Sequence, residues 1–466
     1  MVQDTIAAIS TAVSEAGIGI VRVSGPDAVC AADGIFRTPK GRRILQSVPS
    51  HTIHYGYIFD GDETVDEVLV SVMRAPRSFT AEDTVEINCH GGILATRRVL
   101  ETVLAAGVRP AEPGEFTKRA FLNGRIDLSQ AEAVGLLISA KNEYALKNSV
   151  SQLKGSVLEA VRGLRGQILL EIARIEAALD DPEHYSLDGV PEALKEKIGV
   201  WEGQLKKLID SAHDGRMITE GIRTVIVGRP NAGKSSLMNY LAGADCSIVT
   251  EVAGTTRDVL TQTVNLRGIT LLLTDTAGIR DTEDRVEKIG VERARENARN
   301  ADLLLYVVDS SAPLDENDKE IMELLRESGT PALVLLNKTD LEAETTGEML
   351  KAALYENGLA GQEVLPVSLT TGNGLSQAEE MITQIVYGGR LQVSEGLTIT
   401  SVRQKNLLVS ARESLLKTSK SIELNMPEDF LTIDMMDACE ALGDITGEHA
   451  GEDLVNEIFS KFCMGK

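Results

Sequence analysis

A glycine-rich loop in the middle of the chain has the residue types and spacing that suit phosphate binding. It reads Gly-Arg-Pro-Asn-Ala-Gly-Lys-Ser from Gly228 to Ser235, directly after the apolar run Val225 to Val227. In the pattern G-x-x-x-x-G-K-[ST], placed between a strand and a helix, backbone N–H groups surround the phosphates, the lysine reaches the β- and γ-phosphates, and the hydroxyl binds Mg²⁺. The loop therefore predicts a nucleoside triphosphate site in which Lys234 contacts the phosphates and Ser235 holds the metal.

A second motif, Asp275-Thr276-Ala277-Gly278, follows another apolar run. We expect Asp275 to hold Mg²⁺ through a water molecule and Gly278 to let the backbone approach the γ-phosphate. The next residue, Ile279, stands where Ras-type switches carry a glutamine that orients the attacking water, and its side chain cannot do this. The other candidates are charged residues that could equally be solvated: Arg280, Glu283, Asp284 and Glu287.

A third and a fourth motif are typical of base recognition. Asn337-Lys338-Thr339-Asp340 follows an apolar run, so Asp340 can accept hydrogen bonds from the N1–H and 2-amino groups of guanine, which adenine lacks. Ser368-Leu369-Thr370 takes the place of a last base-binding loop, where such proteins usually carry Ser-Ala-Lys or Ser-Ala-Arg. A loop cap at Asp340 and a turn residue at Ser368 are the alternatives, but four motifs in this order on four strand ends favour a GTP site.

The elements that must position these motifs change character along the 466 residues. Residues 1–120 alternate between apolar and polar side chains in short runs, which predicts a small α+β domain. Apolar residues spaced by three and four from Leu146 to Leu179 predict one long helix that ends at Asp181-Pro182. Further helices are expected at 191–212, 407–424 and 434–462.

Between the helical blocks, short apolar strands alternate with turns and helices. This pattern predicts a doubly wound parallel sheet inserted into an otherwise helical domain. The fold class is therefore a multidomain chain that combines α+β, all-α and α/β parts. We expect an N-terminal domain at 1–120, a helical domain in two parts at 121–215 and 389–466, and a G domain at 216–388.

Charge and cysteine content limit the classes of partner. The net charge is −23, with 47 basic against 70 acidic residues, so a broad nucleic-acid-binding face is not expected. Five cysteines without a C-x-x-C pair fit free thiols in a reducing compartment. The first residues lack a signal-peptide pattern, and no apolar run is long enough to span a membrane, so a cytoplasmic protein is predicted.

Taken together, these residues resemble the MnmE (TrmE) family of tRNA-modification GTPases over essentially the whole chain. The resemblance covers the first two motifs above, Gly228 to Ser236 and Asp275 to Gly278, and five further groups of segments: Gly19-Ile20-Val21-Arg22-Val23-Ser24-Gly25; Cys89-His90-Gly91-Gly92; Pro113-Gly114-Glu115-Phe116-Thr117; Ile248 to Asp258 with Val286 to Gly290; and Phe462-Cys463-Met464-Gly465-Lys466. It implies that a G domain lies within a helical domain and that a folate-binding, dimerising domain precedes both.

The resemblance implies potassium-stimulated hydrolysis in which two G domains meet across their switches. The potassium ligands would be Asn231, Thr250, Val252 and Thr255. Magnesium would be held by Ser235 and Thr256. Glu287 would orient the attacking water through a second water and so replace the missing glutamine. The GTP contacts carried over are Asn231, Ala232, Gly233, Lys234, Ser235, Ser236, Thr250, Glu251, Val252, Ala253, Gly254, Thr255, Thr256, Asp275, Thr276, Ala277, Gly278, Asn337, Lys338, Asp340, Ser368, Leu369 and Thr370.

For folate, the resemblance implies that Arg22, Glu86, Arg125 and Lys466 bind a tetrahydrofolate derivative in its 5-formyl or methylene form. From the residues alone, a structural ion pair between Arg22 and Glu86 is the simpler interpretation. Cys463 could be a nucleophile or a buried thiol, since no activating base stands beside it in the sequence.

The resemblance also implies partners. A homodimer would assemble with the flavoprotein MnmG into a heterotetramer or larger complex that installs an aminomethyl-type group, such as 5-carboxymethylaminomethyl, on the wobble uridine of tRNA. FAD would belong to that partner only, and tRNA would be contacted largely through it. Two rival functions remain: a regulatory or ribosome-assembly GTPase, and a folate enzyme whose G domain only regulates assembly.

Overall fold

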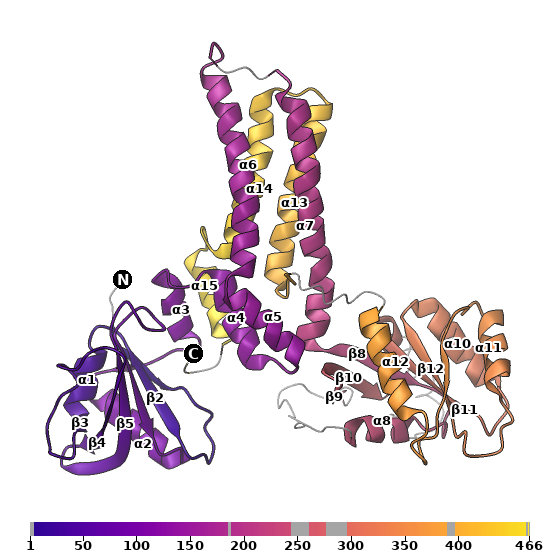
Figure 1. Ribbon diagram of the computed structural model, residues 1–466, viewed down its shortest axis with the longest axis horizontal. Coiled ribbons are helices and arrows are strands. Elements are labelled where there is room, and N and C mark those ends of the chain that lie inside the picture. Colours follow the sequence, from indigo (N-terminus) through magenta and orange to yellow (C-terminus); the bar gives the residue numbers. More distant parts are fainter. Residues whose placement is uncertain are drawn as a thin grey trace, which may run out of the picture. The chain divides into compact units, whose positions relative to one another are not determined.

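The computed structural model describes residues 4–184, 188–243, 261–275, 296–388, 397–462 and 465 (Figure 1). The chain forms two compact units, each made of discontinuous segments. The first contains Met1–Ile138, Val150–Leu205 and Asn406–Lys466, and the second contains Ser139–Ser149 and Lys206–Lys405.

The N-terminal part of the first unit is a seven-stranded sheet with the order β3-β4-β5-β6-β2-β1-β7. Its strands are β1 (Ile6–Ile9), β2 (Gly19–Ser24), β3 (Phe36–Arg37), β4 (Thr52–Asp60), β5 (Glu63–Met73), β6 (Thr84–Cys89) and β7 (Arg109–Pro110). Val68, Val70 and Val72 of β5 are buried in a core that α1 (Ala28–Ile35) and α2 (Ile93–Ala105) share. The alternating runs in the sequence therefore predicted the α+β class correctly.

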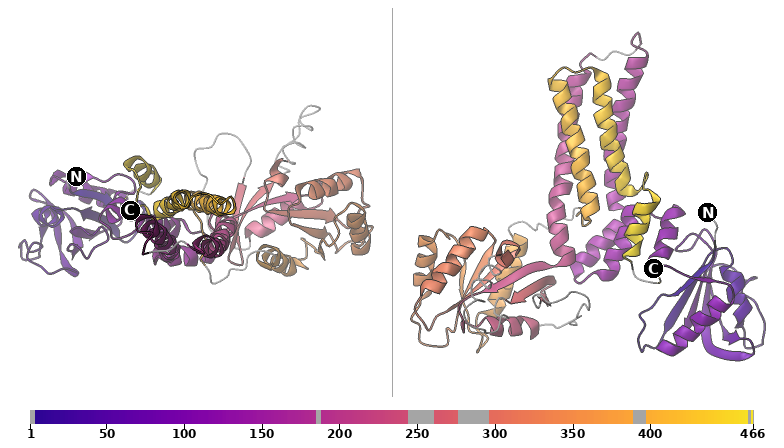
Figure 2. Two further views of the ribbon diagram at one scale, coloured as in Figure 1. Left: turned by 90° about the horizontal axis from the view of Figure 1, so that it is seen from above. Right: turned by 180° about the vertical axis from the view of Figure 1, so that it is seen from behind.

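Four long helices of this chain run side by side as a bundle in both Figure 1 and the right view of Figure 2. They are α6 (Ser156–Asp180), α7 (Val190–Glu220), α13 (Val402–Glu423) and α14 (Glu428–Thr446). Polar contacts connect them: Trp201 Nε1 of α7 donates to Gln167 of α6 at 2.9 Å, and Arg165 of α6 donates to the Cys439 carbonyl of α14 at 3.1 Å.

Shorter helices pack at one end of the first unit's helical part. They are α3 (Glu115–Leu122), α4 (Leu128–Ser139) and α15 (Glu452–Ser460), and the buried Phe459 of α15 packs with Leu128 and Ala131 of α4. Among the described residues, no helix is both long enough and apolar enough to cross a membrane.

The prediction of one helix from Leu146 to Leu179 was wrong, because the chain forms α5 (Glu143–Leu153) and then α6. Gly155 separates them in a left-handed conformation, with φ at 97°. The expected helix 434–462 is likewise two helices, α14 and α15, with Gly447 at φ 87° between them.

Helix α7 continues through Gly215 to Glu220, beyond the predicted end at Ala212. A Cβ at Gly215 would collide with the Ile399 carbonyl, so this glycine permits a close crossing rather than a break.

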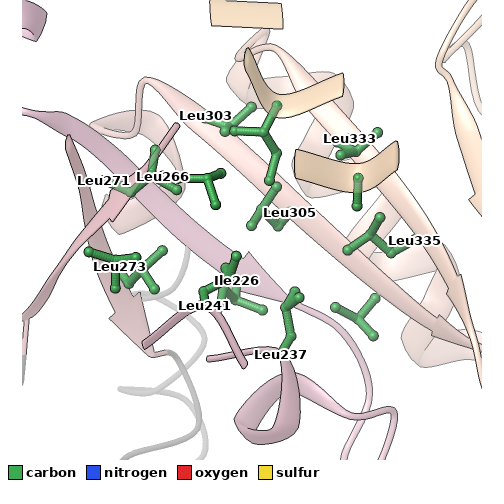
Figure 3. Close-up of a cluster of buried hydrophobic side chains, with 14 of the residues drawn as sticks. Ile226, Leu237, Leu241, Leu266, Leu271, Leu273, Leu303, Leu305, Leu333 and Leu335 are labelled. Carbon is green, nitrogen blue, oxygen red and sulfur yellow. The ribbon is translucent and has the colours of Figure 1, made fainter. Parts of the chain in front are cut away.

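The second unit contains a six-stranded sheet with the order β13-β12-β11-β8-β10-β9. Its strands are β8 (Ile222–Val227), β9 (Thr261–Leu266), β10 (Ile269–Asp275), β11 (Leu303–Asp309), β12 (Ala332–Asn337) and β13 (Val364–Pro366), and its helices are α8 (Lys234–Gly243), α10 (Glu316–Ser328), α11 (Gly347–Glu356) and α12 (Leu375–Gly388). Leu303, Leu305 and Leu333 point to one apolar core (Figure 3), and their neighbours Leu304 and Val334 belong to another.

This sheet is the predicted doubly wound fold with one correction. All neighbouring strands are parallel except β9, which pairs antiparallel with β10 and which the sequence analysis did not predict. The sequence feature that marks this hairpin is Arg267-Gly268, which forms the turn between β9 and β10 with positive φ at both residues, 47° and 86°. The parallel strands end at one edge, as a site built from successive loops requires.

Candidate functional site

The glycine-rich loop leaves β8 and enters α8 as the sequence predicted. Gly228 has φ 155° and Gly233 has φ 113°. A Cβ at Gly228 would meet the Val307 carbonyl, and one at Gly233 would meet the Asn337 side chain. Both positions therefore require glycine for backbone conformation and for close approach.

The side chains of this loop suit a phosphate-binding role. Lys234 Nζ donates to the carbonyls of Gly228 and Arg229 at 2.8 and 2.7 Å, so the ammonium group is held against the loop. Asn231 has φ 63° and is exposed, while Ser235 and Ser236 are exposed at the first turn of α8. Free N–H groups at a helix start favour an anion.

Arg229 anchors the same loop to the start of α10. Its guanidinium lies 3.0 Å from Asp315 and 3.3 Å from Asp318, and it donates to the Pro313 carbonyl at 3.0 Å. Asp318 also accepts from the Tyr306 hydroxyl at 2.9 Å; burial, together with this carboxylate, raises the pKa of Tyr306. The sequence analysis missed this cluster, whose signal was the Asp315–Asp318 capping box of α10.

Asn337 joins the glycine-rich loop to the two base-recognition motifs. It is buried; its Nδ2 donates to the Ala232 carbonyl at 2.8 Å, and its Oδ1 accepts from the Leu369 N–H at 3.2 Å. The predicted motifs are therefore held together by one side chain.

Lys338, directly after β12, supports this arrangement through Asp309 at the end of β11. Its ammonium group lies 2.6 Å from Asp309. Although burial opposes the shift, this hydrogen bond holds the pKa of Asp309 below its usual value. The following Thr339 donates to the Val367 carbonyl at 2.9 Å, which ties the loop to the last motif.

The last motif contacts Asp340 directly. The Ser368 hydroxyl is buried, donates to Asp340 Oδ1 at 2.6 Å and accepts from the Thr371 N–H at 3.1 Å. Leu369, which departs from the usual alanine, packs partly buried against the core beside Gly233, and Thr370 is exposed. Asp340 and Ser368 therefore contact each other, and the serine hydroxyl orients the aspartate carboxylate.

Several predicted site residues lie outside the described residues. Asp275 ends β10, opposite Ile226 of β8, and only its backbone is described. The other predicted site residues that lie outside the described ranges are Thr250, Glu251, Val252, Ala253, Gly254, Thr255, Thr256, Thr276, Ala277, Gly278, Ile279, Arg280, Glu283, Asp284, Glu287, Cys463 and Lys466. In the described part of the chain, no group of three His, Cys, Asp or Glu side chains could hold a metal ion.

Three of the four predicted folate residues converge in the first unit. Arg22 of β2 lies opposite Glu86 of β6, and its Nη2 is 2.8 Å from Glu86 Oε1, so the ion pair considered from the sequence is present. The Arg22 guanidinium lies 5.7 Å from the centre of the Phe79 ring, and that of Arg125 lies 5.1 Å from the same centre. The sequence analysis missed Phe79, which connects the two arginines.

The fourth predicted folate residue, Lys466, follows a glycine that is fixed beside the N-terminal sheet. The Ser10 hydroxyl donates to the Gly465 carbonyl at 3.0 Å. A Cβ on Gly465, which has φ 85°, would collide with the Ile9 carbonyl. These contacts bring the C-terminal segment to the N-terminal sheet.

The fold and the first site define a class: a glycine-rich loop, an Asn-Lys-x-Asp motif and a last Ser loop on the carboxyl edge of a doubly wound sheet make a P-loop GTPase domain. Family models agree and extend this assignment. A model of the MnmE helical domain matches residues 128–463, and a model described as GTP-binding protein TrmE N-terminus matches residues 5–125.

Full-length relatives give the particular family. A tRNA modification GTPase MnmE of Lachnoclostridium phytofermentans is 53% identical over 466 residues, which cover 100% of both chains. One of Geobacillus thermodenitrificans is 47% identical over 99% of both chains. The chain therefore belongs to the MnmE (TrmE) family of tRNA modification GTPases, as the sequence motifs predicted.

Solved structures match only part of the chain. Era of Aquifex aeolicus bound to GDP and AlF4⁻ is 25% identical and covers 42% of this chain and 67% of its own, with a TM-score of 0.30. The G domain of the T. maritima FeoB iron transporter is 27% identical and covers 35% of this chain and 98% of its own, with a TM-score of 0.26. Family membership rests on the full-length comparisons.

Proposed function

We propose that this chain is a potassium-stimulated GTP hydrolase that modifies the wobble uridine of tRNA together with a folate one-carbon donor and the flavoprotein MnmG. The observation that carries the GTPase part is the Asn337 side chain, which bonds to the P-loop and to the last base loop at once. Family membership over the whole chain supports the tRNA part.

In the nucleotide site, the proposed roles follow the geometry. The exposed Asp340 carboxylate would accept the guanine N1–H and amino donors, with Ser368 holding one of its oxygens. Ser235, exposed at the start of α8, suits Mg²⁺, and Thr256 would complete its protein ligands. The other proposed GTP contacts are those carried over by the resemblance.

For hydrolysis, we assign the water-orienting role to Glu287. Ile279 leaves the usual position apolar, and the family pattern selects Glu287 among the charged residues that follow. Asn231, exposed at the rim of the P-loop, is available as a potassium ligand with Thr250, Val252 and Thr255. A monovalent cation bound there would neutralise phosphate charge, as an arginine finger does elsewhere.

In the first unit, we propose a site for a tetrahydrofolate derivative, 5-formyl or methylene, around Phe79. The Arg22–Glu86 pair offers hydrogen-bond donors and an acceptor side by side. Arg22 and Arg125 both contact the Phe79 ring. Gly465, fixed beside Ile9 and Ser10, brings the C-terminal segment to this unit and supports Lys466 as a further ligand. Cys463 is proposed as a nucleophile of that segment.

We propose that the chain is a cytoplasmic homodimer that joins MnmG in a heterotetramer or larger complex. One face of β4 and β5 supports an interface, because Ile53, Tyr55 and Leu69 are exposed there and Tyr55 pairs directly with Leu69. The net charge of −23 supports tRNA binding largely through the partner, which would also carry the FAD. The domain boundaries proposed are 1–120, 121–215 with 389–466, and 216–388.

Single-turnover GTP hydrolysis in potassium and in sodium tests the hydrolytic part. We expect faster hydrolysis in potassium, and a fall in kcat of about 10²-fold for Glu287→Ala, with GTP affinity little changed. Glu283→Ala is the matched control and should hydrolyse GTP normally. Equal rates in both salts would contradict the potassium site, and normal hydrolysis by Glu287→Ala would contradict its role.

A further inference from the structure

A cavity of about 360 Å³ in the first unit has a cationic lining. His51, Arg77 and Arg125 line it together with the Phe79 ring, and no carboxylate side chain among the described residues contributes to its wall. A cavity of this size is at the lower end of the range for small-molecule sites. Its lining therefore suits a small ligand that carries several negative charges.

The two arginines of the cavity are not neutralised by the protein. In the described part of the chain, neither Arg77 nor Arg125 has a carboxylate partner, although the chain carries 70 acidic residues. The nearby Arg74 is the contrast: its guanidinium donates to the Leu45 and Gln46 carbonyls and lies 3.8 Å from Asp83. The Arg74 guanidinium therefore stabilises the fold, whereas the guanidinium charges of Arg77 and Arg125 are available to a ligand.

The segment that presents Arg77 is fixed by contacts on both sides. The Ala75 N–H donates to Asp83 Oδ1 at 2.9 Å, and the Ser78 hydroxyl donates to the Glu82 carbonyl at 2.6 Å. Asn123 donates to the Thr80 carbonyl at 2.7 Å. A ligand would therefore meet a largely preorganised loop and would lose little free energy in ordering it.

His51 also lines the cavity, and two contacts hold it in place. Its Nδ1 lies 2.7 Å from the Ser50 hydroxyl, and its backbone N–H donates to the Val72 carbonyl at 2.7 Å. Nε2 has no hydrogen-bond partner among the described residues, so this ring nitrogen is available to a ligand carboxylate.

We infer that this cavity binds the anionic tail of the folate and that Arg77 and His51 select folates with a poly-γ-glutamyl chain. The inference rests on the proposed folate function. Arg22 is already paired with Glu86, which suits a neutral ring system. Arg125, which contacts the same Phe79 ring, and Arg77 have no carboxylate partner among the described residues and suit negative charges. A folate likewise has a neutral ring system at one end and carboxylates at the other.

A nucleic acid is the weaker candidate for this cavity. Residues 1–120 contain 12 basic and 15 acidic residues, a net charge of −3, so this segment as a whole does not attract a polyanionic RNA backbone. A cavity of about 360 Å³ accommodates a few carboxylates but not a folded RNA surface.

The test is equilibrium titration of the full-length protein with 5-formyl-tetrahydrofolate that carries one or three glutamates. At low salt, we expect the wild type to bind the triglutamate about fivefold more tightly, because two more carboxylates meet partly exposed cations. In Arg77→Gln this ratio should fall toward one, and in His51→Gln it should fall in part. Arg97→Gln is the matched control: it removes an arginine of α2 whose side chain is 72% exposed and pairs with Glu101, and the ratio should stay as in the wild type.

The outcomes separate this inference from the folate function. Equal affinity of the wild type for both folates would overturn the tail site while leaving the folate function standing. No binding of either folate would reject the folate function itself. An unchanged ratio in Arg77→Gln, with weaker tRNA binding, would assign the cavity to nucleic acid and overturn the inference.

Discussion

At the residue scale, Asn337 explains how motifs more than 100 positions apart in the chain become one site. Its amide bonds to Ala232 of the P-loop and to Leu369 of the last base loop, and the side chain is only 3% exposed. Each partner would lose its bond if the amide were removed, and buried polar groups without partners are costly.

Asn337→Ala should therefore lower both stability and nucleotide affinity. We expect a loss of about 1–3 kcal/mol in the free energy of unfolding, since two buried hydrogen bonds are broken. Urea unfolding and GTP titration measure the two effects. Asn373→Ala is the matched control because that side chain is exposed, and it should change neither quantity. A wild-type unfolding curve for Asn337→Ala would contradict the bridging role.

Asp340→Asn should shift base selectivity. The amide replaces one acceptor by a donor, which suits xanthine better than guanine because xanthine carries a carbonyl in place of the 2-amino group. Competition between GTP and xanthosine triphosphate measures the change, and Ser368→Ala should weaken GTP binding without inverting the preference, because it only frees the carboxylate. Unchanged discrimination in Asp340→Asn would refute the base assignment.

The sequence predicted the four motifs because each is local, with its residues within a few positions of one another. It did not predict the ion pairs of Arg229 with Asp315 and Asp318, or the contacts of two arginines with the Phe79 ring. These contacts join residues 46 to 89 positions apart, and no local pattern marks such pairs.

At the element scale, glycines decide where the long helices end. Apolar periodicity continues from α5 into α6, so it could not show the break at Gly155, which depends on a left-handed backbone. Conversely, α7 passes through Gly215, where the glycine serves close packing against Ile399. The same residue type ends one helix and lets another continue, which periodicity alone does not distinguish.

Gly155→Ala should destabilise the protein, because alanine is strained at φ 97°. A loss of about 1 kcal/mol is expected. Gly163→Ala is the opposing control: this glycine lies inside α6, a Cβ there would meet no other atom within 4 Å, and alanine should stabilise by up to about 1 kcal/mol. Thermal unfolding of both variants checks the signs, and a gain for Gly155→Ala would contradict the break.

Helix α5 is tied to the G domain sheet by Asn142. Its Oδ1 caps the helix by accepting from the Ala145 N–H at 2.8 Å. Its Nδ2 donates to the Ile218 carbonyl at 2.9 Å and to the Thr270 hydroxyl at 3.1 Å. Thr270 lies on β10, the strand that ends at Asp275, so the cap connects a helix to this strand.

Two substitutions of Asn142 should distinguish its role as a helix cap from its hydrogen bonds to Ile218 and Thr270. Asn142→Ser keeps a capping oxygen but lacks the amide donor, whereas Asn142→Ala loses both. The free energy of unfolding should therefore be about 1 kcal/mol lower in Asn142→Ala than in Asn142→Ser. Hydrogen exchange of the α5 amides, compared between the two variants, measures the capping part. Equal protection of α5 in both variants would show that Asn142 does not cap the helix.

At the scale of the whole molecule, a strongly acidic chain belongs to a family that acts on tRNA. The charge of −23 is why we propose that tRNA is contacted largely through a partner. The sequence predicted the insertion of one domain into another because composition and periodicity change there. It did not predict that residues 139–149 of the helical stretch cluster with the G domain, because that assignment depends on tertiary contacts.

The central claim is that GTP hydrolysis in this chain drives a modification that needs folate and a flavoprotein. The most direct measurement is a reconstituted reaction that contains the chain, MnmG, tRNA, a tetrahydrofolate donor, glycine or ammonium, GTP and potassium, with wobble uridine analysed by mass spectrometry. We predict modified uridine in the complete mixture, and its loss when GTP or folate is omitted or when Glu287→Ala replaces the wild type. Modified uridine at the wild-type level without GTP, or no modified uridine in the complete mixture, would contradict the account.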